Sequence, residues 1–182
     1  VDDTAHLDAE SVRLAATALT WYLTTSHRPL RDRTTKALVN LLEDRPSVVA
    51  ALLDAFHDVD DPYVIERLYA VAYGCAMRIH NRGRVEVLAD KAYELVFEDD
   101  EPPVNILTRD YAREIIERRI YLDSSASYDL EKVRPPYGSE WPTEIPSMED
   151  LEEEYESDGT RYGGGLGRVL GSVTADDFAR YV

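Results

Sequence analysis

Apolar residues recur at intervals of three and four along residues 8–123, and this spacing constrains the fold more than any other feature of the chain. It is the period of a helix that buries one face. Alternation of period two, which would indicate strands, is not found anywhere in this region. The pattern therefore predicts an all-α protein with short breaks between six helices, near residues 11–25, 29–42, 46–56, 62–79, 84–98 and 105–122.

The stretch DDPYVIERLYAVAYG, residues 60–74, shows how one of these helices is expected to begin and pack. Asp61 before Pro62 predicts an N-cap, because its carboxylate can accept from free N–H groups and proline suits the first helical position. Gly74 disfavours a helix by about 1 kcal/mol relative to alanine. We expect it to permit the close approach of another helix. The expected buried stripe consists of Val64, Leu68, Val71, Cys75 and Ile79.

The sequence NRG, residues 81–83, is predicted to end this helix. Asn81 or Gly83 would adopt the left-handed conformation common after a helix, and His80 would lie in the last turn beside the negative helix end. The next helix would then start near Arg84. Elsewhere, the apolar stripes predict inward-facing side chains that include Ala15, Tyr22, Leu30, Ala37 and Leu107.

The helices form pairs that resemble one another. The second helices of the pairs each carry an early arginine (Arg31 or Arg33, Arg67, Arg109) followed by Ala37, Ala70 and Ala112, which are 33 and 42 residues apart. Such intervals are typical of helical repeats. Residues 8–123 resemble HEAT or armadillo-type repeats, which implies a short right-handed α-solenoid of about three helix pairs. A helical bundle of another kind would share much of the pattern.

The remaining chain has a different composition. Residues 124–160 are rich in proline and acidic residues and are expected to form an extended, partly irregular segment that links from the helices or packs on them. Residues Tyr137 and Trp141 could pack along the helical surface. Residues 161–182 are predicted to contain a glycine-rich turn and a short C-terminal element.

Charge limits the possible partners. The chain has 20 Lys and Arg against 36 Asp and Glu, a net charge of −16. An acidic surface repels phosphate groups, which disfavours nucleic acid and anionic membranes as partners. No apolar run is long enough to span a membrane, and no signal peptide is recognisable. With one cysteine, we expect a cytoplasmic protein. Because the first residue is Val1 rather than methionine, we also expect a piece of a longer protein.

Catalytic and cofactor motifs are not recognisable. GGGLGRVLG, residues 163–171, lacks the order of a dinucleotide-binding loop and the lysine of a P-loop. The four histidines show no metal-ligand spacing, and Cys75 lies on an apolar stripe. We therefore predict no enzyme, no cofactor and no metal. An enzyme site without a motif, among Glu66, Arg67, Tyr69 and His80, is the remaining catalytic alternative.

Twelve tyrosines against three phenylalanines favour an interaction surface, since tyrosine combines an apolar ring with a polar end. Arginines on the second helices would line the same face. The predicted surface comprises Arg31, Arg67, Tyr69, Tyr73, Arg109, Arg113, Tyr137 and Trp141.

Several segments also resemble the helical-repeat portion of large bacterial ATP-binding proteins. They are RPLRDRTTKALV, DDPYVIERLYAVAYG, RDYAREIIE, RPPYGSEWPTEIPS and DFARYV. Those proteins are similar to the multidomain signal-transducing NTPases of the STAND or NACHT type that act in antiphage defence. The resemblance implies a sensor or scaffold segment whose nucleotide site lies elsewhere in the parent protein. A stand-alone adaptor is the alternative.

Overall fold

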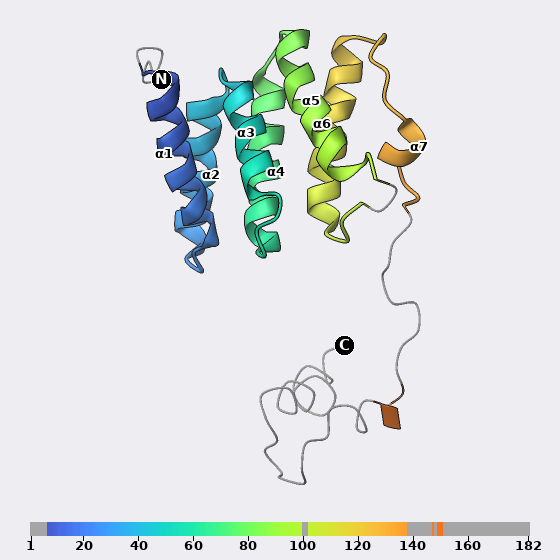
Figure 1. Ribbon diagram of the computed structural model, residues 1–182, viewed down its shortest axis with the longest axis horizontal. Helices are drawn as coiled ribbons and strands as arrows, with labels where there is room; N and C mark the ends of the chain where they lie inside the picture. The colour runs from blue at the N-terminus through green and yellow to red at the C-terminus, as the bar shows by residue number, and fades with distance from the viewer. Residues whose placement is uncertain (1–6, 100–101, 138–146, 148, 151–182) are drawn as a thin grey trace. The chain divides into compact units, whose positions relative to one another are not determined.

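The computed structural model describes residues 7–99, 102–137, 147, 149 and 150, and the regular structure found in these residues is helical throughout. The helices are α1 Ala9–Trp21, α2 Arg28–Leu42, α3 Pro46–Phe56, α4 Pro62–Arg78, α5 Arg82–Val96, α6 Ile106–Leu122 and α7 Leu130–Val133, with a 3₁₀ turn at Tyr22–Thr24 after α1. They follow one another in sequence order across Figure 1. The all-α prediction is confirmed for the described residues.

Side-chain caps start α4 and α6 close to where the sequence predicts these two helices. Asp61 accepts hydrogen bonds from the backbone N–H groups of Tyr63 at 3.0 Å and Val64 at 3.4 Å, directly before Pro62. Asn105 accepts from the N–H of Thr108 at 3.0 Å at the start of α6. These bonds satisfy N–H groups that have no partner within the helix. The predicted role of Asp61 is confirmed.

The prediction for residues 81–83 is wrong. Helix α4 ends at Arg78, and Asn81 instead caps the next helix by accepting from the N–H of Arg84 at 3.2 Å. Gly83 lies inside α5, and His80 is exposed in the link between the helices. Asparagine suits both ends of a helix, and here the extended backbone at Ile79 leaves Asn81 to start α5.

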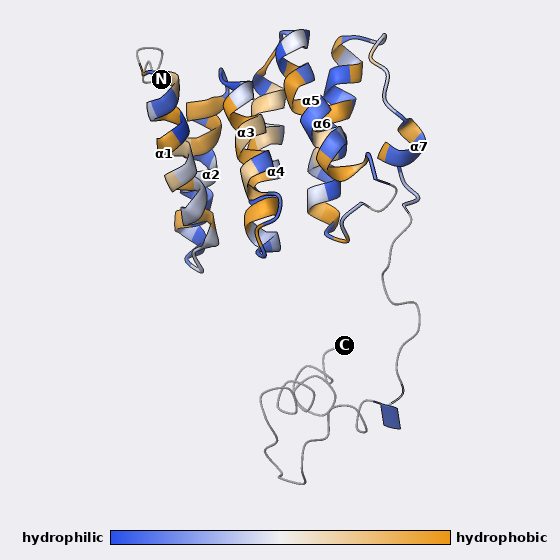
Figure 2. Cartoon of the chain, viewed as in Figure 1, coloured by the Kyte–Doolittle hydropathy of each residue, from blue (hydrophilic) through white to orange (hydrophobic). Residues whose placement is uncertain are grey.

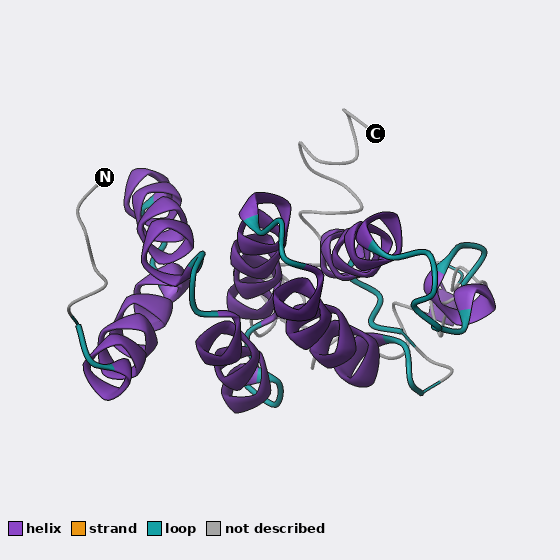
Figure 3. Ribbon diagram, turned by 90° about the horizontal axis from the view of Figure 1, so that it is seen from above, coloured by secondary structure: helices purple, strands orange, loops and turns teal. Residues whose placement is uncertain are grey.

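Helix α4 lies between α2 and α6 and packs against both, while α3 packs against α5. Contacts also join α1 to α2, α3 to α4 and α5 to α6. Figure 3 shows these helices side by side from above, and Figure 2 shows that hydrophobic residues occur along all of them. Fully buried core side chains include Leu38, Leu42, Val64, Leu68, Val71, Leu88, Ile115 and Ile116.

Gly74 lies where α4 meets α2. A Cβ atom at this position would lie 2.9 Å from Cγ2 of Val39, closer than side chains normally approach. The thiol of Cys75 also lies next to α2, with Sγ 3.8 Å from the carbonyl oxygen of Val39. The expected close approach of a second helix at Gly74 is confirmed.

Several inward-facing predictions are wrong. Ala15, Tyr22, Leu30, Ala37 and Leu107 are exposed, whereas Thr20, Thr34, Val39 and Thr108 are buried. The Thr20 hydroxyl donates to the carbonyl oxygen of Ala16 at 2.9 Å, so this side chain can be buried without losing its hydrogen bond. The pattern of apolar residues in the sequence does not identify a threonine that is buried in this way.

Helix α7 and the residues after it cover the end of α5. Val133 is fully buried, and the Tyr137 ring stacks on Phe97 with centroids 6.1 Å apart. The Tyr137 hydroxyl donates to the carbonyl oxygen of Val133 at 2.8 Å. Packing of Tyr137 on the helices is therefore confirmed, while α7 itself was not predicted. Trp141 and residues 161–182 lie outside the described residues.

Candidate interaction surface

Two of the predicted arginines share one tyrosine. The Arg31 guanidinium lies 4.7 Å from the centre of the Tyr63 ring, and that of Arg67 lies 5.8 Å from the same centre. A guanidinium over an aromatic face is attracted by the electron density of the ring. Arg67 also pairs with Asp32 at 3.4 Å, and Arg31 donates to the carbonyl oxygen of Thr25 at 2.9 Å. This group joins the first turns of α2 and α4.

A second group lies where α6 meets the chain after α7. The Arg109 guanidinium is 4.9 Å from the centre of the Tyr137 ring. Arg113 pairs with Asp110 and Glu114. Burial opposes the charge of Arg113, but the neighbouring carboxylates outweigh it and raise the pKa of this arginine. Both groups therefore place arginines beside tyrosine rings and carboxylates on the same set of helices.

Contacts between α4 and α6 connect the two groups. The Asn105 side chain donates to Glu66 at 3.3 Å, and the rings of Tyr73 and Tyr111 lie 5.6 Å apart. We call the set Arg31, Tyr63, Arg67, Arg109, Arg113 and Tyr137 the arginine–tyrosine row. Sequence reasoning did not include Tyr63, although its position four residues before Arg67 on one helix was a usable signal.

The remaining predicted surface residues have different surroundings. Tyr73 is half-buried against Tyr111, and Trp141 lies outside the described residues. Tyr69 is 2% exposed, so its predicted place on the surface is wrong. Burial and the charge of Glu94 raise the pKa of Tyr69 above its usual value. Tyr73, one turn further along α4, contacts Tyr111 of α6, whereas Tyr69 faces the core.

The row can attract anionic or aromatic groups, but its arginines already have contacts within the chain. Carboxylates pair with Arg67 and Arg113, and tyrosine rings lie beside Arg31 and Arg109. The Nε atoms of Arg31, Arg67 and Arg109 are buried and have no hydrogen-bond partner within the described residues. The row therefore holds neighbouring helices together, and its outer N–H groups are what a partner could contact.

The residues of the catalytic alternative do not converge. Glu66 and Arg67 lie near the start of α4, and His80 follows its end, about 20 Å away at 1.5 Å per residue. Burial raises the pKa of the Cys75 thiol to about 12, which keeps it protonated and unreactive. In the described part of the chain, the histidine, cysteine and acidic side chains form no group that could hold a metal ion.

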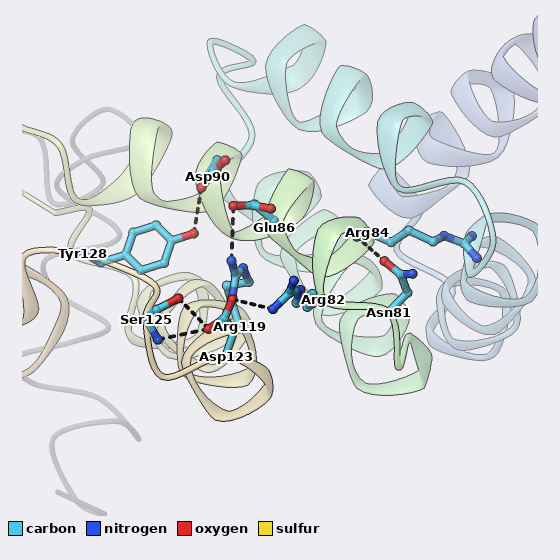
Figure 4. Close-up of polar contacts among 9 residues, drawn as sticks. All are labelled: Asn81, Arg82, Arg84, Glu86, Asp90, Arg119, Asp123, Ser125 and Tyr128. Carbon is cyan, nitrogen blue, oxygen red and sulfur yellow. Dashed lines mark hydrogen bonds and ion pairs between the residues drawn. The ribbon is translucent and has the colours of Figure 1, made fainter.

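A polar network joins α5 to α6 and the turn that follows (Figure 4). The nearly buried Arg119 bonds Glu86 at 3.2 Å and pairs with Asp123 at 3.3 Å. Asp123 also accepts from the hydroxyl of Ser125 at 2.6 Å and pairs with Arg82 at 3.4 Å. The hydrogen bonds from Ser125 and the charge of Arg119 lower the pKa of Asp123 from 3.8 to about 2.

Asp123 should make part of the stability depend on pH. Because its pKa is lower in the folded state, its contribution is complete above 3.8 and is lost as the pH falls towards 2. We expect Asp123→Asn to melt at a lower temperature than the wild type at pH 6. The difference should shrink as the pH falls from about 4 to about 2. Thermal melts across this range would measure it. A difference that stays constant would contradict the prediction, and Asp58→Asn at an exposed site is the matched control.

None of the helices in the described residues is both long and apolar enough to cross a membrane. Comparisons of the chain with models of protein families, with curated proteins and with solved structures found no match.

Proposed function

We propose that the chain is a non-catalytic protein-interaction or scaffold module, built as a short right-handed HEAT-like solenoid. The observation that carries this proposal is the sequence separation of the bonds between helix pairs. Side-chain hydrogen bonds from one pair to the next join residues 35 to 40 apart, as in Arg67–Asp32, Arg84–Asp44, Lys91–Asp54 and Asn105–Glu66. Stacked repeats of similar length produce a similar sequence separation at each junction between neighbouring helix pairs.

The end of the stack at α1 supports a role within a larger assembly. Leu14 of α1 is 54% exposed, and so is Tyr22 in the turn that follows, although Val12 and Ala16 of α1 are buried. Trp21, at the end of the helix, instead packs on Phe56 of α3, with ring centroids 5.0 Å apart. A solenoid that ends in solvent needs a polar outer face on its terminal helix. An apolar outer face instead favours packing against a further element. At the other end, ion pairs such as Arg134–Glu117, at 2.6 Å, cover α6.

The proposed parent is a multidomain NTPase of the signal-transducing type, in which this segment senses or scaffolds in the cytoplasm. Its partner is a protein or another domain of the same polypeptide. The net charge of −16 supports a protein over nucleic acid. A stand-alone adaptor is the second candidate, supported by the one compact unit to which helices α1 to α7 belong. An all-α enzyme is less favoured, since its candidate residues lie apart.

The test is to read the coding sequence on both sides of Val1 to Val182. A P-loop and an acidic magnesium motif in the same reading frame would support the NTPase parent. Deletion of residues 8–123 from that parent should then abolish assembly with the partner but preserve nucleotide binding. A start codon directly before Val1 and a stop codon after Val182 would overturn the NTPase parent in favour of the adaptor.

A further inference from the structure

Two arginines of the arginine–tyrosine row have no carboxylate partner. Arg31 lies over the Tyr63 ring, and Arg109 lies over the Tyr137 ring. Arg31 also donates to a backbone carbonyl oxygen, whereas the other two arginines of the row pair with carboxylates. Among the residues that the structure describes, no Asp or Glu forms an ion pair with either of these two guanidinium groups.

This arrangement leaves two positive charges partly buried with no opposite charge beside them. Arg31 and Arg109 are both half-buried. Removing a charge from water is unfavourable unless an opposite charge replaces the lost hydration. Each guanidinium carries five N–H donors in a planar fork that matches a carboxylate. The two sites are therefore suited to anionic groups that the described residues do not provide.

The surroundings of these arginines are locally basic in an acidic protein. From the N-cap to the eighth helical residue of α2, α4 and α6, six arginines stand against four carboxylates, although the chain has a net charge of −16. The four carboxylates already accept from neighbouring groups: Asp32, Asp61, Glu66 and Asp110. Repulsion by distant acids is screened beyond about 8 Å at physiological ionic strength. An acidic partner is therefore attracted at this place on the chain.

Exposed apolar side chains lie beside the same arginines. Tyr63 is 45% exposed and Leu107 is 46% exposed. Both are two residues after the N-cap of their helix, so they occupy equivalent positions in α4 and α6. Arginine and tyrosine are enriched at the centres of protein interfaces, where apolar contacts add to charge pairing. These two side chains provide an apolar contact between the two arginines.

The spacing of the arginines indicates the form of the ligand. Arg31 and Arg109 are each four residues after the N-cap, on helices that both pack against α4. Packed helices lie about 8–10 Å apart, so two steps across the row cover about 16–20 Å. An extended chain advances about 3.3 Å per residue. Two carboxylates five or six residues apart on an extended segment would therefore reach both arginines, and a residue midway between them would lie over α4.

We propose that the arginine–tyrosine row, together with Leu107, binds an extended acidic segment of a protein partner. The segment has carboxylates five or six residues apart that pair with Arg31 and Arg109. An apolar residue between them packs on Tyr63 and Leu107. The inference rests on the proposed function as an interaction module and names the chemistry of its partner.

The test is fluorescence anisotropy with the full chain and a labelled heptapeptide that has glutamate at both ends, leucine in the middle and serine or threonine elsewhere. We expect saturable binding at physiological ionic strength and none when glutamine replaces both glutamates. Placing the glutamates three residues apart should weaken binding at least about threefold, because one carboxylate then loses its arginine. Arg31→Gln with Arg109→Gln should weaken binding at least about tenfold.

The matched control is Arg13→Gln with Arg84→Gln, which makes the same charge change at arginines that pair with carboxylates elsewhere on the chain. It should change the affinity by less than about twofold. Leu107→Ser, at an exposed position, should weaken binding about threefold without unfolding the chain. This variant keeps the proposal testable if the loss of Arg31 and Arg109 destabilises the fold.

Equal weakening by both double variants, or equally tight binding of inorganic tripolyphosphate, would overturn the proposal, since either result shows a general attraction of anions. An unchanged affinity in Leu107→Ser would also overturn it, because the proposed segment packs on this side chain. A failure here leaves the reading-frame test untouched, so the two proposals can fail separately.

Discussion

Phe97→Ala is expected to lower the free energy of unfolding by about 3–5 kcal/mol. Phe97 is 1% exposed and is among the largest fully buried side chains. It follows the last turn of α5, and its ring stacks on Tyr137. Truncation would remove the buried ring and leave a cavity that the surrounding helices can fill only in part. It would also remove the surface on which Tyr137 packs.

Chemical denaturation of the full chain measures this effect, and Tyr121→Ala is the matched control. Tyr121 is 80% exposed, so its truncation should change stability by no more than about 0.5 kcal/mol. The signal of Tyr137 in near-ultraviolet circular dichroism should also decrease in Phe97→Ala. A loss below about 1 kcal/mol would mean that the end of α5 is not part of the cooperative core.

The fourth predicted helix illustrates what the sequence can determine. Asp61 and Pro62 specify its start through local hydrogen bonding and backbone geometry, which depend on neighbouring residues alone. Its end was mispredicted because Asn81 can serve either end of a helix, and packing of the next helix decides between them. The spacing of apolar residues and the capping residues thus predict that a helix exists better than they predict the residue at which it ends.

Which face of each helix is buried was harder to predict than which segments form helices. Helix α4 has neighbours on several sides, so its apolar sector is wide and does not show which tyrosine is buried. Tyr69 enters the core, and Tyr63 stays 45% exposed beside Arg31 and Arg67. Tyr63 lies on a different helix from Arg31, and Asp32 lies on a different helix from Arg67, at separations that the sequence alone does not fix.

Gly74→Leu should destabilise the protein by about 3 kcal/mol, because α2 occupies the space that its side chain would need. Even a single Cβ would lie 2.9 Å from Cγ2 of Val39. Val39 is 8% exposed and branched at Cβ, so it has little freedom to move aside. For Gly74→Ala the clash opposes a gain of about 1 kcal/mol in helix propensity, and we expect a smaller net loss.

A double-mutant cycle with Val39→Ala separates the clash from the backbone effect. Removing the two Val39 methyl groups opens the space beside Gly74, so Gly74→Ala should be neutral or stabilising in that background. The coupling between the two sites should reach at least about 1 kcal/mol, as expected for residues in direct contact. Additive losses, measured by denaturation of all four proteins, would show that α2 and α4 do not approach closely at Gly74. Two contacts place α4 directly on α2 in this region, the approach at Gly74 and the contact of the Cys75 thiol with the Val39 carbonyl oxygen. That result would remove the first of them.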